Sequence, residues 1–469
     1  MEPKHVPLIE DVQELEGFPT PGSEQGTTSV LDPEYLLLCA DRAKTICFHA
    51  APKALSVEGR PSDTGVTKRA RSAGAAIKAL LTALHKGETG PKEKEETAAS
   101  SEAVKQESCT LPGSLVAPLY VFARTHIADK PWTDRESRAQ ARDILAGLLR
   151  ASRCGSIAEL LRGHREGERG VFEDVMVLLK PQLKKDTWEL NPATKNVFSS
   201  TLHQVTRPWL SDFLESVLPP SLLISDDHRT ENKILGVSCL HHIIRNVPAA
   251  DLLQYNRLQV VYHALFNHLY TPEADLIQAV LSCLLDLLPV LERSAQVTRG
   301  PSQRIRYCDD VFQLILTQME MEPKILLRRV YAKHLPMFVE RLNIGVVRHL
   351  KRLERVLLGY LEVYDGPEET SRLAILETMK CTIMHAWPRI PCRLLVLLKA
   401  LLRFIYDVAT DCSLTPPHVK SDMLQEATHC LILLDRCSER QIKDILEGIS
   451  HACTEPQVLQ CLEKVQQDV

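Results

Sequence analysis

The sequence has few aromatic residues and no strong excess of charge of either sign. Phenylalanine, tryptophan and tyrosine make up 5% of the 469 residues, although 44% of the chain is hydrophobic. A core of aliphatic side chains with few rings favours packed helices over β-sheets, where aromatic and β-branched residues are enriched. The net charge is −4, from 56 basic and 60 acidic side chains. This balance argues against direct nucleic-acid binding through bulk positive charge.

The sequence also lacks the apolar segments of exported and membrane proteins. The opening residues, MEPKHVPLIEDVQELEGF, contain no positively charged stretch followed by an apolar one, so we expect no secretory signal. The two most apolar runs are Leu276–Leu291 and Leu394–Val408, and charged residues interrupt both. Neither reaches the roughly 18 uncharged apolar residues of a membrane-spanning helix. We therefore expect a soluble protein that does not contact a membrane.

Catalytic and metal-binding motifs are missing too. The sequence contains no phosphate-binding glycine loop, no HExxH, no GxSxG and no kinase HRD or DFG. The 14 cysteines include no pair at CxxC spacing, and most lie among apolar residues at helical offsets, as do Cys239, Cys283, Cys381 and Cys430. We interpret these as small buried residues with reduced thiols. The sequence therefore predicts neither an enzyme nor a bound cofactor.

The chain divides into three regions by composition. Residues 1–110 contain proline- and glycine-rich breaks, and Lys86–Ser108 reads KGETGPKEKEETAASSEAVKQES. Such a segment cannot bury enough apolar surface to offset the entropy of ordering it. We predict a poorly ordered, low-complexity N-terminal region with a linker at 86–110, although Pro33–Ile46 and Ala70–His85 have short helical patterns. Residues 111–220 are predicted as an N-terminal helical region, and 221–469 as a HEAT-like α-solenoid.

Proline marks a repeat in the last region. Four prolines follow apolar helical stretches: Pro248, Pro289, Pro336 and Pro388. Five others lie in short turns at a mean spacing of 46 residues: Pro272, Pro323, Pro367, Pro417 and Pro456. Proline costs little in the first turn of a helix, because the N–H it removes has no partner there. Repeats of about 40–47 residues are typical of HEAT arrays. The spacing therefore predicts an all-α solenoid of helix–turn–helix units.

The helical patterns agree with a stacked array. Arg393–Asp407 has one narrow polar stripe, formed by Lys399, Arg403 and Asp407, and Asp275–Leu291 is similar. A helix that is apolar on nearly every side needs neighbours on both sides. Leu350–Leu361 has the commoner pattern with one apolar face, made of Leu353, Val356, Leu357 and Tyr360.

The strongest polar cluster is SDDHRTENK at 225–233. Asp226 and Asp227 beside His228 could bind a divalent metal or act as acid and base. Asp227 or Thr230 could equally cap a helix over Glu231–Asn246, with the acids favoured by the helix dipole. The same residues could also contact a partner. We favour the cap.

Two further patterns have two readings. Cys239 and His242 are three residues apart and could hold two corners of a zinc site, but no second pair with ligand spacing follows, so we favour packing. Basic residues cluster at 328–333 and 348–355, and equivalent positions of successive repeats align along one face of a solenoid. Such a ladder could bind an acidic partner segment or be a solvated face. The candidate partner-binding residues are Trp209, Asp226, Asp227, Arg229, Lys233, Arg348, Lys351, Arg352 and Arg355.

Long runs of the sequence resemble a known family. They are NPATKNVFSSTLHQVTRPWL, LPPSLLISDDHRTENKILGVSCLHHIIRNVPAADLLQYNR, HALFNHLYTPE, VRHLKRLERVLLGYLEVYDGPEE and LQEATHCLILLDRC. They are similar to the family of the second Tel-two-interacting protein, the smallest subunit of the Triple T complex. The resemblance covers roughly residues 115–469 and does not extend to 1–110.

The resemblance implies a non-enzymatic scaffold and cochaperone subunit with HEAT-like repeats. Its expected partners are two larger helical-repeat subunits and, indirectly, chaperone machinery and phosphatidylinositol 3-kinase-related kinases. It would thereby support DNA-damage, telomere and nutrient signalling, in cytoplasm and nucleus. We expect residues 221–469 to dock on the largest partner. The alternative is a karyopherin-like cargo adaptor, and an enzyme using Asp226, Asp227 and His228 is a remote second.

Overall fold

The computed structural model of the chain describes residue 18 and residues 32–53, 63–88, 111–163, 170–298 and 307–468. These residues form helices and turns, with no strand among them. The all-α prediction is therefore confirmed. The helices divide into two compact units, with the division between Ile224 and Ser225. The expected boundaries at residues 110 and 220 stay predictions.

The first unit is built around α3. The helices, with η for 3₁₀ turns, are α1 (Pro33–Ala50), α2 (Asp63–Glu88), α3 (Gly113–His126), α4 (Arg135–Ala151), α5 (Ile157–Arg162), α6 (Phe172–Leu179), η2 (Lys180–Gln182), α7 (Thr194–Leu202), η3 (Trp209–Phe213) and α8 (Leu214–Ser225). α3 packs on α1, α4, α6 and α7, and α2 packs on α4.

Two helices thus lie inside the region predicted to be poorly ordered. α1 and α2 cover the segments with helical patterns and extend beyond them. Their buried faces are rich in alanine, including Ala40 and Ala43 in α1 and Ala70 and Ala73 in α2, which lets the helices approach their neighbours closely. The poor order predicted for residues 1–110 as a region stays a prediction. Most of the predicted linker, residues 89–110, lies outside the described residues.

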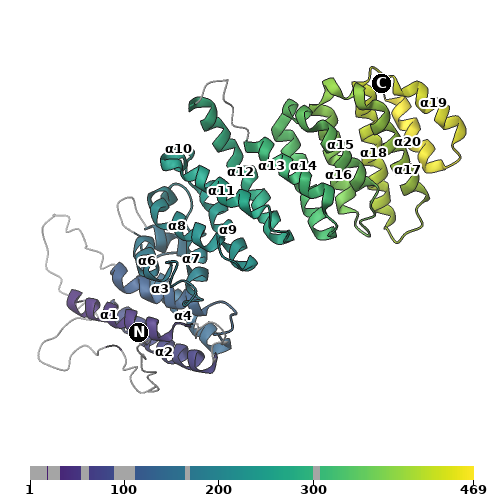
Figure 1. Ribbon diagram of the computed structural model, residues 1–469. Helices are drawn as coiled ribbons and strands as arrows, with labels where there is room; N and C mark the ends of the chain where they lie inside the picture. The colour runs from purple at the N-terminus through teal and green to yellow at the C-terminus, as the bar shows by residue number, and fades with distance from the viewer. Residues whose placement is uncertain are drawn as a thin grey trace, which may run out of the picture. The chain divides into compact units, whose positions relative to one another are not determined.

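The second unit contains two rows of helices. They are α9 (Thr230–Asn246), α10 (Ala249–Leu253), η4 (Gln254–Asn256), α11 (Arg257–His268), α12 (Ala274–Thr298), α13 (Tyr307–Met321), α14 (Ile325–Leu342), η5 (Asn343–His349), α15 (Leu350–Leu361), α16 (Thr370–His385), η6 (Trp387–Arg389), η7 (Pro391–Arg393), α17 (Leu394–Thr410), α18 (Pro417–Cys437), α19 (Ile442–Ala452) and α20 (Pro456–Gln467). In one row α9, α12, α14, α16, α18 and α20 each pack on the next, and α11, α13, α15 and α17 each pack on a member of that row (Figure 1). This is the predicted helical-repeat solenoid.

The spacing of the turn prolines agrees with this architecture. The five turn prolines lie just before, or at the first residue of, α12, α14, α16, α18 and α20, which all belong to the same row. The other set differs from the expectation, since Pro289 and Pro336 lie inside α12 and α14 rather than after them. Proline inside a helix removes one backbone hydrogen bond. Packing of these helices between two neighbours offsets that loss.

α12 is the most apolar helix of the unit. Its stretch Ala274–Arg293 has a mean hydropathy of 1.8 and would be long enough to cross a membrane, and half of it is buried. The helix packs on α9, α11, α13 and α14, and side chains such as Leu281 and Leu288 are fully buried. A core helix passes the same test of length and composition as a membrane span. Packing inside the solenoid therefore accounts for the composition of α12.

Candidate protein-binding surface

The 225–233 cluster surrounds a buried carboxylate. Asp227 accepts a hydrogen bond from the His228 N–H at 2.8 Å, lies 2.8 Å from the His228 ring and accepts another from the Asn232 amide. Burial opposes the charged form of Asp227, but these donors outweigh it and hold its pKa below the usual range. The predicted helix cap is wrong, because α9 begins at Thr230 with Arg229 at the N-cap and no side-chain cap bond.

The remaining charges of the cluster face a buried histidine or solvent. Burial lowers the pKa of His268 in α11, nearby Lys233 lowers it further, and Asp226 opposes both. Asp226 and Arg229 are exposed, while Lys233 is partly buried. Asp226 and Arg229 are therefore exposed to solvent, while Asp227 is held inside the fold.

The Cys239–His242 pair, for which we favour packing over zinc, lies on α9, which packs on α12. Cys239 is fully buried, as are Cys283, Cys381 and Cys430 to within 1%. The neighbouring His241 points to α12, with Nε2 2.8 Å from an Asp286 carboxylate oxygen. The described cysteines are free thiols, which agrees with their interpretation as small packing residues.

The basic residues of η5 and α15 fall into two classes. Arg348 donates to both carboxylate oxygens of Asp309 at 2.6 and 2.7 Å, and Arg352 pairs with Glu320 at 2.9 Å. Both acids lie on α13. Of the four partner-binding residues predicted in η5 and α15, two thus bind an adjacent helix of the same chain.

The other two residues form no ion pair with any described residue. Lys351 and Arg355 are exposed, and neither makes an ion pair within 4 Å in the described part of the chain. They lie four residues apart, so they share one face of α15.

Opposite charges about one repeat apart in the sequence meet throughout the second unit. Arg348 and Asp309 are 39 residues apart, and Arg403 and Glu362 are 41 apart. Arg341–Glu292 and Lys380–Glu426 also bridge helices, and Arg436 of α18 pairs with Asp468 just after α20. Exposed pairs contribute about 0–1 kcal/mol each. Of the basic ladder expected from the sequence, Arg329, Arg348 and Arg352 form such bridges to neighbouring elements.

The pairing at Asp309 predicts a pH effect. Burial alone would raise the pKa of Asp309, but hydrogen bonds from Arg348 and His349 outweigh it, and the pKa lies below the ordinary value. A lowered pKa stabilises the fold above the unfolded pKa, and that contribution is lost as the pH falls through the folded pKa. In Arg348→Gln the folded pKa of Asp309 moves back towards its unfolded value, so this variant should be less stable at neutral pH and should lose less stability as the pH falls. Urea unfolding at pH values from neutral to about 3 checks this. Arg355→Gln is the control. An equal loss of unfolding free energy with falling pH in the two variants would contradict the assignment.

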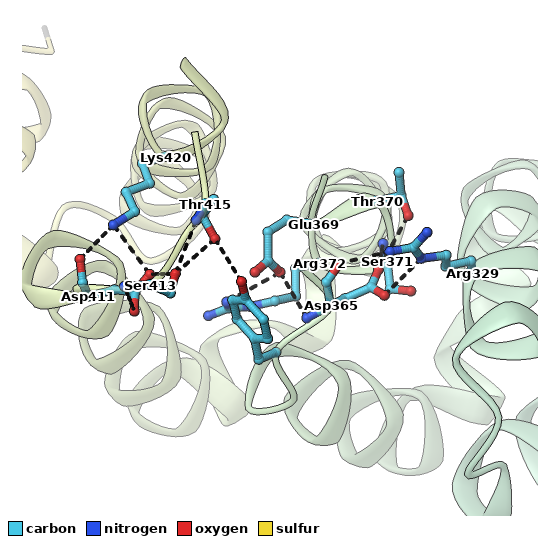
Figure 2. A network of polar contacts seen from close by, with 11 residues as sticks. Arg329, Asp365, Glu369, Thr370, Ser371, Arg372, Asp411, Ser413, Thr415 and Lys420 are labelled. Atoms are coloured by element: carbon cyan, nitrogen blue, oxygen red, sulfur yellow. Dashed lines mark hydrogen bonds and ion pairs between the residues drawn. The ribbon is translucent and has the colours of Figure 1, made fainter. Parts of the chain in front are cut away.

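A polar network joins α14 to the turn before α16 (Figure 2). Arg329 Nε donates to Asp365 at 2.8 Å, and another guanidinium nitrogen donates to Glu368 at 3.2 Å. Asp365 is buried and accepts further hydrogen bonds from the Ser371 N–H at 2.7 Å and the Thr370 hydroxyl at 3.3 Å. The carboxylate therefore fixes both the first turn of α16 and its contact with α14.

The centre of the network is an ion pair in the core. Glu369 is 0% exposed, has a left-handed backbone with φ of 50°, and pairs with Arg372 at 3.3 Å. Its Oε2 also accepts a hydrogen bond from the Asp365 N–H at 3.2 Å. The Arg372 guanidinium lies over the Phe404 ring of α17, 4.7 Å from its centre.

The network continues to the turn between α17 and α18 (Figure 2). The Thr415 hydroxyl lies 3.4 Å from that of Tyr364 and 3.0 Å from that of Ser413. Lys420 donates to the Asp411 carbonyl at 2.5 Å. Turns of two successive repeats are thus linked by hydrogen bonds. Sequence reasoning missed this network, although the acidic run at 365–369 was its signal.

Trp209 belongs to the first unit. It begins η3, is 37% exposed, and the Arg162 guanidinium lies over its ring at 4.7 Å. Of the other predicted residues, four lie just before or in the first turn of α9 and four in η5 and α15, with the elements from α10 to α14 between them in the chain. Within the second unit the predicted residues thus belong to two different parts of the helix array, and their role in binding stays a prediction.

Known structures share a distant likeness with this chain. A yeast importin-β (Kap95p) structure is 13% identical, with a TM-score of 0.41, covering 93% of this chain and 50% of that one. A Kap95:Nup1 complex is 11% identical, with a TM-score of 0.46, covering 93% and 60%. At this similarity they bear on neither function nor partners.

The sequence comparisons are far closer. The model of the Tti2 family matches residues 173–365. TELO2-interacting protein 2 of Homo sapiens is 60% identical over 353 residues, covering 75% of this chain and 70% of the relative. The Mus musculus protein of the same name is 59% identical over 350 residues, covering 75% and 68%. This confirms the resemblance seen in the sequence, and the chain belongs to the Tti2 family.

Proposed function

We propose that this chain is a non-catalytic scaffold subunit of a Triple T complex, which binds TELO2 and a second, larger helical-repeat protein. The observation that carries the proposal is the 60% identity to human TELO2-interacting protein 2 over three quarters of the chain. The solenoid of the second unit supports it, since stacked repeats offer long surfaces for protein partners. The complex would support maturation and stability of phosphatidylinositol 3-kinase-related kinases, in cytoplasm and nucleus.

The second unit has surface suited to such binding. Large apolar side chains are exposed on several of its helices and turns, including Met321, Leu326, Trp387 and Leu395. A stable interface between helical-repeat proteins should bury more than about 1,000 Å2. We place the docking of the largest partner on this unit. The chain would act through its partners and chaperone machinery, without touching nucleic acid or membrane.

A pulldown of the tagged chain at about 0.5 M salt tests the proposal. The Debye length is then only about 4 Å, so partners held by exposed charge pairs alone are lost. We expect TELO2 and one further large helical-repeat protein in near-equal amounts, identified by mass spectrometry. A spread of unrelated cargo would instead support the karyopherin-like adaptor. A control with residues 89–108 deleted should retain both partners, because we assign that segment no role in assembly.

A further inference from the structure

A groove of about 440 Å3 lies between α15 and α17. Its apolar lining consists of Leu358, Leu361, Leu395, Val396, Ala400 and Phe404. Leu395 and Val396 remain 69% and 42% exposed, and Tyr406 on the same helix is 52% exposed. The described residues thus leave an apolar surface uncovered along this row of the solenoid.

The two helices run in the same direction along the groove. Glu354 of α15 pairs with Arg393 just before α17 at 3.5 Å, and Glu362 pairs with Arg403 at 3.1 Å. Advancing along one helix therefore advances along the other. The first turns of both helices lie at the same end of the groove.

Lys351 and Arg355 extend the groove at that end. Residues 351, 355, 358 and 362 recur at helical spacing, so Lys351 and Arg355 share a face with groove residues Leu358 and Glu362. Lys399 of α17 also lines the groove.

The two ends of the groove differ in charge. At the far end, Arg403 is neutralised by Glu362 at 3.1 Å and by Asp407 at 3.7 Å. At the near end, no ion pair within 4 Å involves the exposed Lys351, Arg355 or Lys399 in the described part of the chain. The groove therefore has an apolar floor and, towards one end, three positive charges that form no ion pair within 4 Å in the described residues, although Arg355 also acts on Glu320 of α13 through space.

We propose that this groove binds an amphipathic helix of a partner subunit, with an apolar face on the floor and acidic residues beside Lys351, Arg355 and Lys399. A helix fits because the groove follows two parallel helices, and helix-in-groove recognition uses apolar anchors at helical spacing. Acidic residues fit because they complement the positive charges, which also fixes the direction of the bound helix. This inference rests on the proposed function and names the surface that a partner uses.

Peptide binding to the full chain tests the chemistry directly. The probe is a fluorescent helical peptide of about 18 residues with leucines on one face and glutamates towards one end. Matched peptides carry lysine for glutamate or serine for leucine. We expect anisotropy to show at least about tenfold tighter binding of the glutamate peptide than of either matched peptide. Arg355→Glu and Leu395→Asp should each weaken its binding by a similar factor. Equal binding of the glutamate and lysine peptides would overturn the proposal.

Two control variants test whether the loss of peptide binding is specific to the groove. Lys333→Glu changes an exposed charge on α14, and Leu414→Asp changes a 92% exposed leucine in the turn before α18. Both should bind the peptide as the unmodified chain does. All four variants should unfold at the same urea concentration, since each substitution lies on the surface.

Partner capture separates this inference from the proposed function. If the unmodified chain captures TELO2 and its companion, Arg355→Glu and Leu395→Asp should lose at least one of them, and both controls should retain them. If the groove variants capture both partners fully, the groove is not the interface and the proposed function stands. If the unmodified chain captures neither partner, the proposed function fails, and the peptide experiment alone decides the groove.

Discussion

Replacing Arg372 by alanine should destabilise the second unit by about 3–5 kcal/mol, because it leaves a buried carboxylate without its counter-charge. Glu369 is 0% exposed and the Arg372 side chain 11%, so water reaches little of the pair. Glu369 Oε1 already lacks a hydrogen-bond partner in the described residues. Loss of Arg372 also removes the cation over the Phe404 ring. Urea unfolding of the full chain measures the loss, and hydrogen exchange assigns it to α16.

Two further variants provide comparisons for the unfolding cost of Arg372→Ala. Arg403→Ala breaks an ion pair whose arginine is 66% exposed, and should cost no more than about 1 kcal/mol. Glu369→Gln keeps an acceptor for the Asp365 N–H and should cost about 1–3 kcal/mol. If Arg372→Ala cost as little as Arg403→Ala, the pair would not stabilise the core.

Phe338→Ala should cost a similar amount for a different reason. Phe338 is 0% exposed on α14, which packs between α12 and α16. Truncating a fully buried ring removes apolar contacts and leaves a cavity that the neighbouring helices fill only in part, at about 3–5 kcal/mol. The loss is measured as a lower urea midpoint of the full chain.

The adjacent residue supplies the control. Met337 lies on the same turn and is 41% exposed, so Met337→Ala should change the free energy of unfolding by about 0.5 kcal/mol or less. Equal losses at the two positions would contradict the burial of Phe338 in the core.

The sequence predicted the fold well because its signals are local. The stretch Leu350–Leu361 was expected to bury Leu353, Val356, Leu357 and Tyr360, and α15 has these bounds and buries these residues. Turn prolines marked one row of helices, since each lies where a helix of that row begins. Periodicity and proline chemistry depend on neighbours a few residues away, which a single sequence contains.

The candidate site was harder to predict because it depends on distant neighbours. Arg348 and Arg352 looked like free surface charges, yet acids of α13, more than 30 residues earlier, hold them. Asp227 looked like a helix cap, yet the Asn232 amide and His228 occupy it. Lys399, Arg403 and Asp407 were visible as a polar stripe, but only the approach of α15 makes them the rim of a groove. Opposite charges separated by about one repeat in the sequence are the signal that would have revealed the ion pairs between helices.

The bridges between repeats have a mechanical consequence. Pairs such as Arg348–Asp309 and Arg403–Glu362 link neighbouring helices at the partly exposed surface, outside the apolar contact between the helix rows. An ion pair far from the axis about which two stacked repeats bend acts with a long lever arm. It therefore resists bending more strongly than its small contribution to the free energy of unfolding suggests. Salt screens such pairs, because the Debye length falls from about 10 Å at 0.1 M to about 3 Å at 1 M. The bending stiffness of the second unit should therefore fall as the ionic strength rises, while its melting temperature stays nearly constant.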